Sequence, residues 1–269
     1  GQGTEKEVPV AGLTFEDDAM ARMEALYRSR ELTLRRKEML AALALREGER
    51  VLDVGSGPGF FAETMAEIIG PTGSVFGVDV SAPFVDRAIA RRRHDWVSYA
   101  VGDATALPEP DAGRDVVTCV QVIEYVPDVA AVGRDIARVL RPAGRGLINV
   151  ADWGGLIWHS DDPERMDRVC RAWDAHSAHP RLPRALAPIL RQAGLRVDDV
   201  LVHQFAGLHW GPDRHPTHLA EFFRAYARDS GAVSAAEADA WHDEQAKLAA
   251  EGRHFFSLPS FSFLVSRPD

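Results

Sequence analysis

A glycine-rich turn near residue 55 constrains the fold of this chain more than any other feature. Residues 50–54 (RVLDV) form a short apolar run, and the turn GSGPG at 55–59 follows it directly. A helical pattern then begins at Phe60. Glycines let a ligand approach the backbone, and the free N–H groups at the start of a helix bind polar ligand groups. The run therefore predicts a buried strand, a ligand-binding turn and a helix in direct succession.

Four more short buried runs follow before residue 151. They lie at 75–80, 97–101, 115–120 and 146–150, and helical patterns at 83–93 and 128–140 separate some of them. Five strands that alternate with helices at short spacing are typical of a parallel sheet with helices on both faces. We therefore expect an α/β fold of the Rossmann-like kind.

Helical segments flank this core on both sides. Residues 16–45 carry apolar side chains at helical spacing, 163–194 are helical, and 196–205 and 255–266 have the pattern of two further strands. We expect one domain over 1–269, with a helical N-terminal region at 16–47. A helical cap at 206–252 is expected between the sixth and seventh strands, because a structureless loop of that length is improbable.

Composition excludes several classes of protein. The 269 residues include 31 Lys+Arg and 40 Asp+Glu, a net charge of −9, which argues against a generic nucleic-acid or anionic-membrane binder. Two cysteines suggest no disulfide framework, and the N-terminus lacks the apolar run of a signal peptide. No apolar run approaches the ~18 residues of a membrane span. We expect a cytoplasmic protein.

No metal site is expected. His176, His179, His215 and His218 have helical spacing in pairs, but no cysteine cluster or matching carboxylate set accompanies them.

Two acidic residues near the glycine turn distinguish between two kinds of nucleotide ligand. Asp79 ends the second predicted strand, where an acidic side chain accepts hydrogen bonds from both hydroxyls of a ribose. The dinucleotide fingerprint G-x-G-x-x-G would place its third glycine at Phe60, so the chain departs from it. Asp53, just before the turn, would repel a pyrophosphate but suits a cationic amino group. A ligand with a ribose and an amino-acid end fits better than NAD.

The ordered motifs VLDVGSGPG, VFGVDVS, GDATALP, DVVTCVQVIEYVPD and LRPAG resemble those of the class I S-adenosylmethionine (SAM)-dependent methyltransferases. Within them the chain looks like the small-molecule group related to the ubiquinone- and menaquinone-pathway methyltransferases. The resemblance runs motif by motif over about residues 20–150 and only by pattern over 182–205 and 255–266. It implies a seven-stranded, mostly parallel sheet of order 3-2-1-4-5-7-6, with strand seven antiparallel and a helical lid insertion. It also implies SAM as methyl donor and S-adenosylhomocysteine (SAH) as product.

The resemblance implies a role for each matching residue. The glycines of the turn would cradle SAM, Asp79 would bind the ribose, and Asp103 would accept from the adenine amino group. Asp53 and Gln121 would face the methionine portion, and the region 16–47 would close over the cofactor. The expected cofactor-binding residues are Tyr27, Arg36, Asp53, Gly55, Ser56, Gly57, Gly59, Asp79, Val80, Asp103, Ala104 and Gln121.

Two subfamily signatures are absent. The stretch CVQVIEY after strand four lacks the Asn/Asp-Pro-Pro-Tyr/Phe motif of amino-directed DNA and RNA enzymes. The histidine- and tryptophan-bearing N-terminal signature of the quinone enzymes is also missing, so a quinone substrate is not implied.

Aromatic residues concentrate beyond residue 150, where the cap is expected. Five of six Trp and nine of ten His lie there. Such residues suit the lining of a pocket for a flat or apolar small molecule, and equally the cap's own core. The expected substrate-pocket residues are Trp153, Trp158, Trp210 and Phe222.

A catalytic base is useful only for some acceptors. Methyl transfer is an in-line displacement at the sulfonium methyl, and a hydroxyl, phenol or acidic carbon acceptor benefits from a base near neutral pKa. His159, after strand five, and His209, after strand six, are the histidine candidates. Asp152 and Glu124 are carboxylate candidates at strand ends. An amine or thiol acceptor needs no base.

The leading hypothesis is a SAM-dependent methyltransferase that acts on an aromatic or apolar small molecule, with no nucleic-acid or membrane partner, as a monomer or homodimer. One alternative is a nucleic-acid methyltransferase, which would have a basic face and strong salt dependence. The other is a SAM-binding protein without transferase activity.

Overall fold

An eight-stranded sheet forms the centre of the protein, in a computed structural model that describes residues 17–269. Its path is β3-β2-β1-β4-β5-β8-β6, and β7 also pairs with β8. The first five strands are parallel, whereas β8 runs antiparallel to its neighbours. The bounds are β1 (Arg50–Val54), β2 (Ser74–Asp79), β3 (Val97–Val101), β4 (Arg114–Val120), β5 (Leu140–Ala151), β6 (Ile157–Trp158), β7 (Arg196–Gly207) and β8 (Phe256–Ser266).

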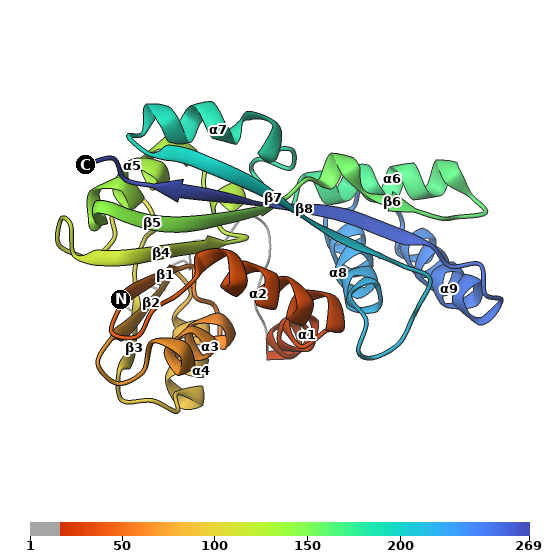
Figure 1. The fold of residues 1–269 in the computed structure, drawn as a ribbon. Coiled ribbons are helices and arrows are strands. Elements are labelled where there is room, and N and C mark those ends of the chain that lie inside the picture. Colours follow the sequence, from red (N-terminus) through yellow and green to blue (C-terminus); the bar gives the residue numbers. More distant parts are fainter. Residues whose placement is uncertain (1–16) are drawn as a thin grey trace, which may run out of the picture.

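This topology confirms the expected Rossmann-like fold. The predicted sixth and seventh strands are β7 and β8, and the order from β3 to β8 is the one the resemblance implied. The sequence did not predict β6, a two-residue strand that pairs with the beginning of β8. Figure 1 shows that β7 and β8 extend well beyond β5 as a twisted ribbon.

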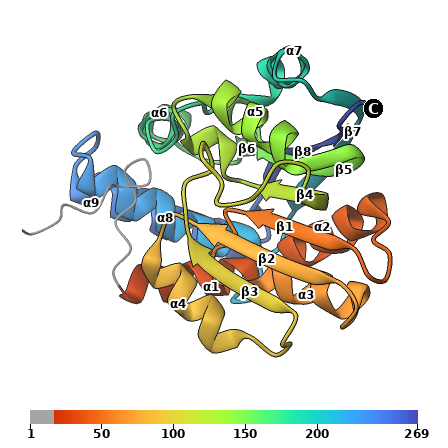
Figure 2. The same ribbon diagram turned by 90° about the vertical axis from the view of Figure 1, so that its left-hand side faces the viewer.

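Helices cover both faces of the sheet. Figure 2 shows α3 (Phe60–Ile69) and α4 (Ala82–Arg91) on one face and α5 (Val129–Val139) and α7 (Pro183–Gln192) on the other. The helix α2 (Arg30–Leu43) packs on the α3 face, and α1 (Asp17–Tyr27) precedes it. The helices α6 (Pro163–Asp174), α8 (His215–Asp229) and α9 (Ala235–Ala250) gather around the extended ends of β7 and β8 (Figure 1).

Successive side chains of β1 point into two different hydrophobic cores, one on each face of the sheet. Val51 packs with Met39 and Met65 from α2 and α3. Leu52 belongs to the opposite core, with Ile136 of α5. Because successive side chains of a strand point to opposite faces, a strand covered on both sides is apolar throughout. The apolar residues Val51, Leu52 and Val54 therefore reflect the two helical layers that cover β1.

The single N-terminal helix expected at 16–45 is wrong, because two helices occupy the described part of that range. The chain turns at Arg28 and Ser29, and Arg36 Nη1 donates to the freed carbonyl of Tyr27 at 2.7 Å. Neither glycine nor proline marks this break. A contact from the next helix stabilises it, which a helical pattern does not reveal.

The region 163–194, expected as helical, is also divided, into α6 and α7. The cap segment at 206–252 contains α8 and α9. No helix of residues 17–269 is both long and apolar enough to pass through a membrane.

Candidate active site

A cavity of about 310 Å³ lies at the carboxyl ends of β1, β2 and β4. In open α/β sheets this edge is where ligands bind. The strand ends and the loops after them form one wall, and α1, the loop after β4 and the cap form the other. The argument below uses the lining residues Tyr27, Gly55, Gly57, Asp79, Val80, Asp103, Ala104, Gln121, Tyr125, Trp153, Trp173, His215, Leu219 and Phe222.

The glycine turn forms part of this wall. Gly55 has φ +69° and Gly57 has φ +52°, a backbone region that favours glycine. A Cβ at Gly55 would lie 2.0 Å from Val122 Cγ2, and a Cβ at Gly57 would point toward the Tyr27 hydroxyl at 3.5 Å. Gly59 caps the start of α3 and does not line the cavity. The turn therefore brings bare backbone to the cavity at Gly55 and Gly57.

The Asp79 carboxylate connects the glycine turn to the end of β2 through hydrogen bonds. Its Oδ2 accepts from the Gly57 N–H at 2.8 Å and its Oδ1 from the Ser81 N–H at 2.9 Å. Burial raises the pKa of Asp79, while the two backbone hydrogen bonds oppose this shift. Each carboxylate oxygen keeps a second lone pair for a ligand hydroxyl. The neighbouring Val80 is 49% exposed and offers an apolar surface at the cavity edge.

Asp103 and Ala104 follow β3 and line the same cavity. Asp103 Oδ1 accepts from the backbone N–H and the hydroxyl of Thr105 at 2.8 and 2.7 Å. These bonds stabilise a turn within the loop after β3, and the Gly102 N–H donates to the Asp79 carbonyl at 3.0 Å, which holds this loop beside the end of β2. The structure thus brings together the ribose and adenine residues that the sequence selected, and their roles remain predictions.

Asp53, expected at the methionine end, lines a second, smaller cavity of about 40 Å³ together with Tyr27, Arg36 and Ser56, whereas Gln121 lines the larger cavity. Asp53 is buried, accepts from Thr118 Oγ1 at 2.7 Å, and has its pKa raised by burial to about 7. The Ser56 hydroxyl is buried without a partner. A cationic group placed here would favour the ionised form of Asp53.

Arg35 was missed by the sequence reasoning, which selected its neighbour Arg36. Arg35 is buried, and its Nη1 donates to Gln121 Oε1 at 2.9 Å and to Asn149 Oδ1 at 3.1 Å. Burial lowers its pKa to about 10, with Arg36 adding to the effect. Arg36 instead holds the corner between α1 and α2, through Tyr27 and Thr33.

Glu124, which the sequence offered as a carboxylate candidate for the base, is a second buried group. It follows β4, beside the cavity residue Tyr125, and neither of its carboxylate oxygens has a hydrogen-bond partner. Burial raises its pKa to about 8, against the opposing effect of Arg35. The carboxyl is therefore largely protonated at neutral pH.

Aromatic side chains from the turn after β5, from α6 and from α8 of the cap form a wall opposite the strand ends. Trp153 and Phe222 line the cavity as expected, and Trp173, which was not expected, joins them. The Trp173 ring stacks on His176 at 3.8 Å and on Phe223 at 4.3 Å between ring centroids. Stacking of this kind keeps the indole in place as a flat wall.

Two other tryptophans expected in the pocket do not line it. Trp158 packs in the cap's own core, 5.1 Å from Trp241, and its Nε1 donates to His254 Nε2 at 3.2 Å. Trp210 lies edge-on to His254 at 5.3 Å. Both contribute to the packing of the cap instead of to the cavity wall.

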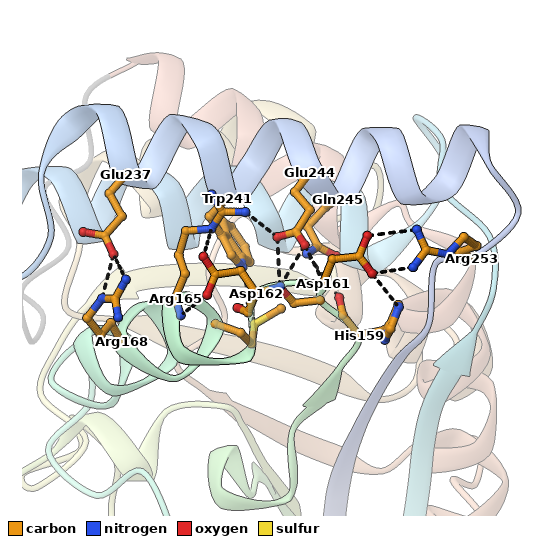
Figure 3. Close-up of polar contacts among 12 residues, drawn as sticks. His159, Asp161, Asp162, Arg165, Arg168, Glu237, Trp241, Glu244, Gln245 and Arg253 are labelled. Carbon is orange, nitrogen blue, oxygen red and sulfur yellow. Dashed lines mark hydrogen bonds and ion pairs between the residues drawn. The ribbon is translucent and has the colours of Figure 1, made fainter.

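The candidate bases His159 and His209 do not line the cavity either. Figure 3 shows His159 directed toward Asp161 in a polar network that joins the segment before α6 to α9. Glu244 accepts from Arg165 in this network, and Asp161 pairs with Arg253. His209 is exposed in the segment after β7. Their catalytic role remains a prediction that the placement does not support.

No group of three or more His, Cys, Asp and Glu side chains within residues 17–269 is arranged to hold a metal ion. His176 instead contacts Tyr125 and the Trp173 carbonyl, and His179 contacts the carbonyls of Val126 and Pro127.

The part of the chain that contains the parallel strands matches a known protein family. A family model described as a methyltransferase domain matches residues 52–148. The chain is 40% identical over 210 residues to the 27-O-demethylrifamycin SV methyltransferase of Amycolatopsis mediterranei, covering 72% of this chain and 70% of that one. It is 30% identical over 193 residues to the ubiquinone biosynthesis O-methyltransferase of Xanthomonas axonopodis pv. citri, covering 69% and 76%.

Other relatives are longer. The chain spans about half (48%) of an uncharacterized 37.1 kDa protein in transposon TN4556 of Streptomyces fradiae, with 35% identity over 171 residues and 61% of this chain covered. It spans 29% of the arsenite methyltransferase of Halobacterium salinarum, with 37% identity over 112 residues and 40% of this chain covered.

Solved structures share the fold at low identity. The phosphoethanolamine N-methyltransferase 2 of Haemonchus contortus, in complex with SAM, gives a TM-score of 0.61 at 19% identity, covering 94% of this chain and 58% of that one. The [4+2]-cyclase SpnF gives 0.57 at 20% identity, covering 88% and 81%. These likenesses establish the fold of the sheet and its helices.

Proposed function

Because the chain belongs to the family of SAM-dependent methyltransferases, we propose that it transfers the methyl group of SAM to an apolar or aromatic small molecule. One observation carries this proposal. A single cavity joins the strand-end residues Asp79 and Gln121 to the aromatic wall of Trp153 and Phe222. A cofactor on one side and an acceptor on the other would therefore meet within the same cavity.

The strand-end side of the cavity fits SAM. The bare backbone at Gly57 leaves room where a Cβ would enter, and the Asp79 carboxylate has lone pairs for ribose hydroxyls. The unpartnered Ser56 hydroxyl and the buried Asp53 suit the polar, charged methionine end. When bound, SAM supplies an electrophilic methyl group on a positively charged sulfur.

The chain's own residues would align the reaction and keep water out. Arg35 fixes Gln121 at the end of β4, so this side chain enters the cavity in one orientation. Tyr27 of α1 and Leu219 of α8 cover the cavity from the helical side. Holding two reactants in line and excluding water are the main contributions a protein makes to this chemistry.

A small-molecule acceptor is favoured over a nucleic acid. The net charge of −9 opposes a polyanionic partner, and the aromatic wall is built mainly from buried side chains. The relatives above that are named for methylation of 27-O-demethylrifamycin SV and for ubiquinone biosynthesis point in the same direction. A SAM-binding protein without transferase activity is the alternative that the experiment must separate.

Calorimetric titration with SAM and SAH tests the cofactor half of the proposal. We expect micromolar binding by the wild-type protein and at least about tenfold weaker binding by Asp79→Asn, because a charge-assisted hydrogen bond is lost. Asp86→Asn on the exposed side of α4 is the matched control. Folded protein that binds neither ligand would overturn the proposal.

Transfer of a radiolabelled methyl group tests the other half. The acceptor panel contains phenols, macrocyclic alcohols, amines and a duplex DNA oligonucleotide. Labelling of an organic acceptor supports the proposal, and labelling of the DNA alone would overturn it. Tight SAM binding without any transfer would instead indicate the non-transferring alternative.

A further inference from the structure

His215 is a buried polar residue in the apolar part of the cavity. It begins α8, is 4% exposed, and lines the cavity beside Leu219 and Phe222. Its backbone N–H donates to Glu31 Oε2 at 2.9 Å, which fixes the first turn of α8 against α2. The histidine is therefore held at the junction of the N-terminal helices, the cap and the cavity.

The imidazole ring has no hydrogen bond to any described residue. Two phenylalanine rings flank it, Phe205 at 4.9 Å and Phe256 at 5.7 Å between centroids, and its Nδ1 is buried without a partner. Leaving a buried polar group without a hydrogen-bond partner is unfavourable. Nδ1 is enclosed, so the ring nitrogen open to a ligand in the cavity is Nε2, which also has no bond to a described residue.

The charges around His215 keep it neutral. Burial lowers its pKa to about 3, and Arg35 of α2 and His218 of α8 act in the same direction. Glu31, the acidic group on the facing helix, bonds to the backbone of His215. A neutral imidazole has one nitrogen that accepts a hydrogen bond and one that donates.

The apolar part of the cavity favours one class of acceptor. Among the described residues that line it, the only acidic side chains are Asp79 and Asp103, both at the strand-end side. An ammonium acceptor would therefore find no opposite charge beside His215. The free energy lost on removing the ammonium group from water would not be recovered there. A neutral hydroxyl bonds to a neutral imidazole without that penalty.

We propose that the acceptor carries a hydroxyl group on an aromatic or apolar frame, and that His215 binds this hydroxyl and receives its proton. The inference rests on the proposed function. The acceptor oxygen forms a bond to the methyl carbon, and the carbon–sulfur bond of SAM breaks with its electron pair remaining on sulfur. The hydroxyl proton moves to a ring nitrogen of His215, which returns it to water after the product leaves.

A weakly basic imidazole is sufficient for this step. The hydroxyl becomes strongly acidic only as the new oxygen–carbon bond forms, so a neutral nitrogen already in contact with it takes the proton late in the reaction. A histidine that was protonated beforehand would have no acceptor nitrogen to offer.

The test uses binding and emission of a probe, without turnover. The SAH-bound protein is titrated with 2-naphthol and, separately, with naphthalene, which lacks the hydroxyl. Excited 2-naphthol is a strong acid and emits as the anion only beside a proton acceptor. The variants are His215→Leu, His215→Gln, and His218→Leu as the matched histidine on the same helix, which does not line the cavity.

We expect His215→Leu to weaken 2-naphthol binding by about tenfold and to leave naphthalene binding within about twofold, because one buried hydrogen bond is lost. The anion emission of bound 2-naphthol should disappear in both His215 variants, while His215→Gln should retain part of the affinity. The His218→Leu protein should behave like the wild type.

Equal weakening for both probes, no effect of His215→Leu, or absence of 2-naphthol binding by the wild type would each overturn the inference. Binding of SAH is measured first in every variant, so that loss of the fold is recognised. Failure of the wild type to bind SAH would refute the proposed function itself, whereas intact SAH binding with a probe result independent of His215 refutes only this inference.

Discussion

Arg35 Nη1 lies 2.9 Å from Gln121 Oε1, which connects the second N-terminal helix to the end of the fourth strand. The same nitrogen donates to Asn149 Oδ1 of β5 at 3.1 Å. Gln121 has φ +54°, an uncommon value for a residue with a side chain. The guanidinium therefore supports an unusual backbone conformation where the cavity wall begins.

Further polar contacts continue this link through the sheet. Asn149 Nδ2 donates to Ser262 Oγ of β8 at 3.0 Å, and the same hydroxyl contacts His203 Nε2 of β7 at 2.7 Å. The other His203 nitrogen contacts Glu38 on α2. A buried polar network whose members satisfy one another is rigid, because each lost contact leaves an unpaired group.

The first prediction concerns this network. Arg35→Leu should destabilise the protein by about 3 kcal/mol, since it leaves Gln121 and Asn149 without their donor in a buried site. The affinity for SAM should fall by about tenfold because Gln121 is no longer held. Urea denaturation and calorimetry measure the two effects. Lys37→Leu, on the exposed side of the same helix, is the control, and an unchanged affinity in Arg35→Leu would contradict the role given to Gln121.

The second prediction compares three glycines with positive φ. Gly231 has φ +68° and open space around its Cβ position, whereas Gly55, at φ +69°, would place a Cβ against Val122. Gly231→Ala should therefore lose only about 1 kcal/mol of stability, and Gly55→Ala about 3 kcal/mol. Gly57→Ala should resemble Gly231→Ala in stability but bind SAM more weakly, because its Cβ enters the cavity.

Equal stability losses at Gly55 and Gly231 would show that Val122 moves aside. Retention of full SAM affinity in Gly57→Ala would show that the cofactor does not approach this part of the turn.

The third prediction concerns pH. The folded-state pKa of Glu124, about 8, lies above its ordinary value of 4.5, so between these values the unfolded carboxyl is ionised and the folded one protonated. Its stabilising contribution is complete below pH 4.5 and is lost as the pH rises through 8. Glu124→Gln, which cannot ionise, should therefore be about 4 kcal/mol more stable than the wild type at pH 8.

At pH 4.5 the two proteins should agree within about 0.5 kcal/mol. Urea unfolding across this pH range measures the difference, with Glu47→Gln as the exposed control. A variant that is less stable than the wild type at pH 8 would mean that Glu124 is ionised in the folded protein and paired with Arg35.

The fourth prediction concerns the attachment of the cap. Glu244 of α9 accepts from Ser160 Oγ, the Asp161 N–H and Arg165 Nη2, as Figure 3 shows. Glu244→Gln should lower cap stability by about 1–2 kcal/mol, because two neutral donors and one charged donor lose an anionic partner. Hydrogen exchange should quicken in α9. Calorimetry should give an unchanged affinity for SAM, whose expected site lies at the strand ends.

Asp243→Asn provides a matched control, since the Asp243 side chain is 84% exposed. Faster exchange throughout the sheet in Glu244→Gln would show that the cap and the sheet unfold as one unit.

The strand–turn–helix succession at 50–69 was predictable because its signals are local. Apolar residues, glycines and a helix pattern follow one another within 20 positions. Asp79 and Asp103 were predictable for a related reason, since they come directly at or after strands whose carboxyl ends must meet at one edge of the sheet. Local order thus determined the α/β class and the strand-end side of the cavity, whereas the strand order was implied by the resemblance to a known family.

The residues on the acceptor side of the cavity were not predictable in this way, because contacts between segments distant in the sequence place them there. Arg35 and Arg36 are adjacent in the sequence, and only the rotation of α2 on the sheet decides which one reaches Gln121. His215 and His159 likewise look equivalent as lone histidines, yet one lines the cavity and the other lies in the α6–α9 network. The sequence by itself determined the parallel strands and the helices that alternate with them, but not β6 or the breaks within 16–45 and 163–194. The tertiary structure decided which side chains face the cavity, because this depends on how each helix packs against its neighbours.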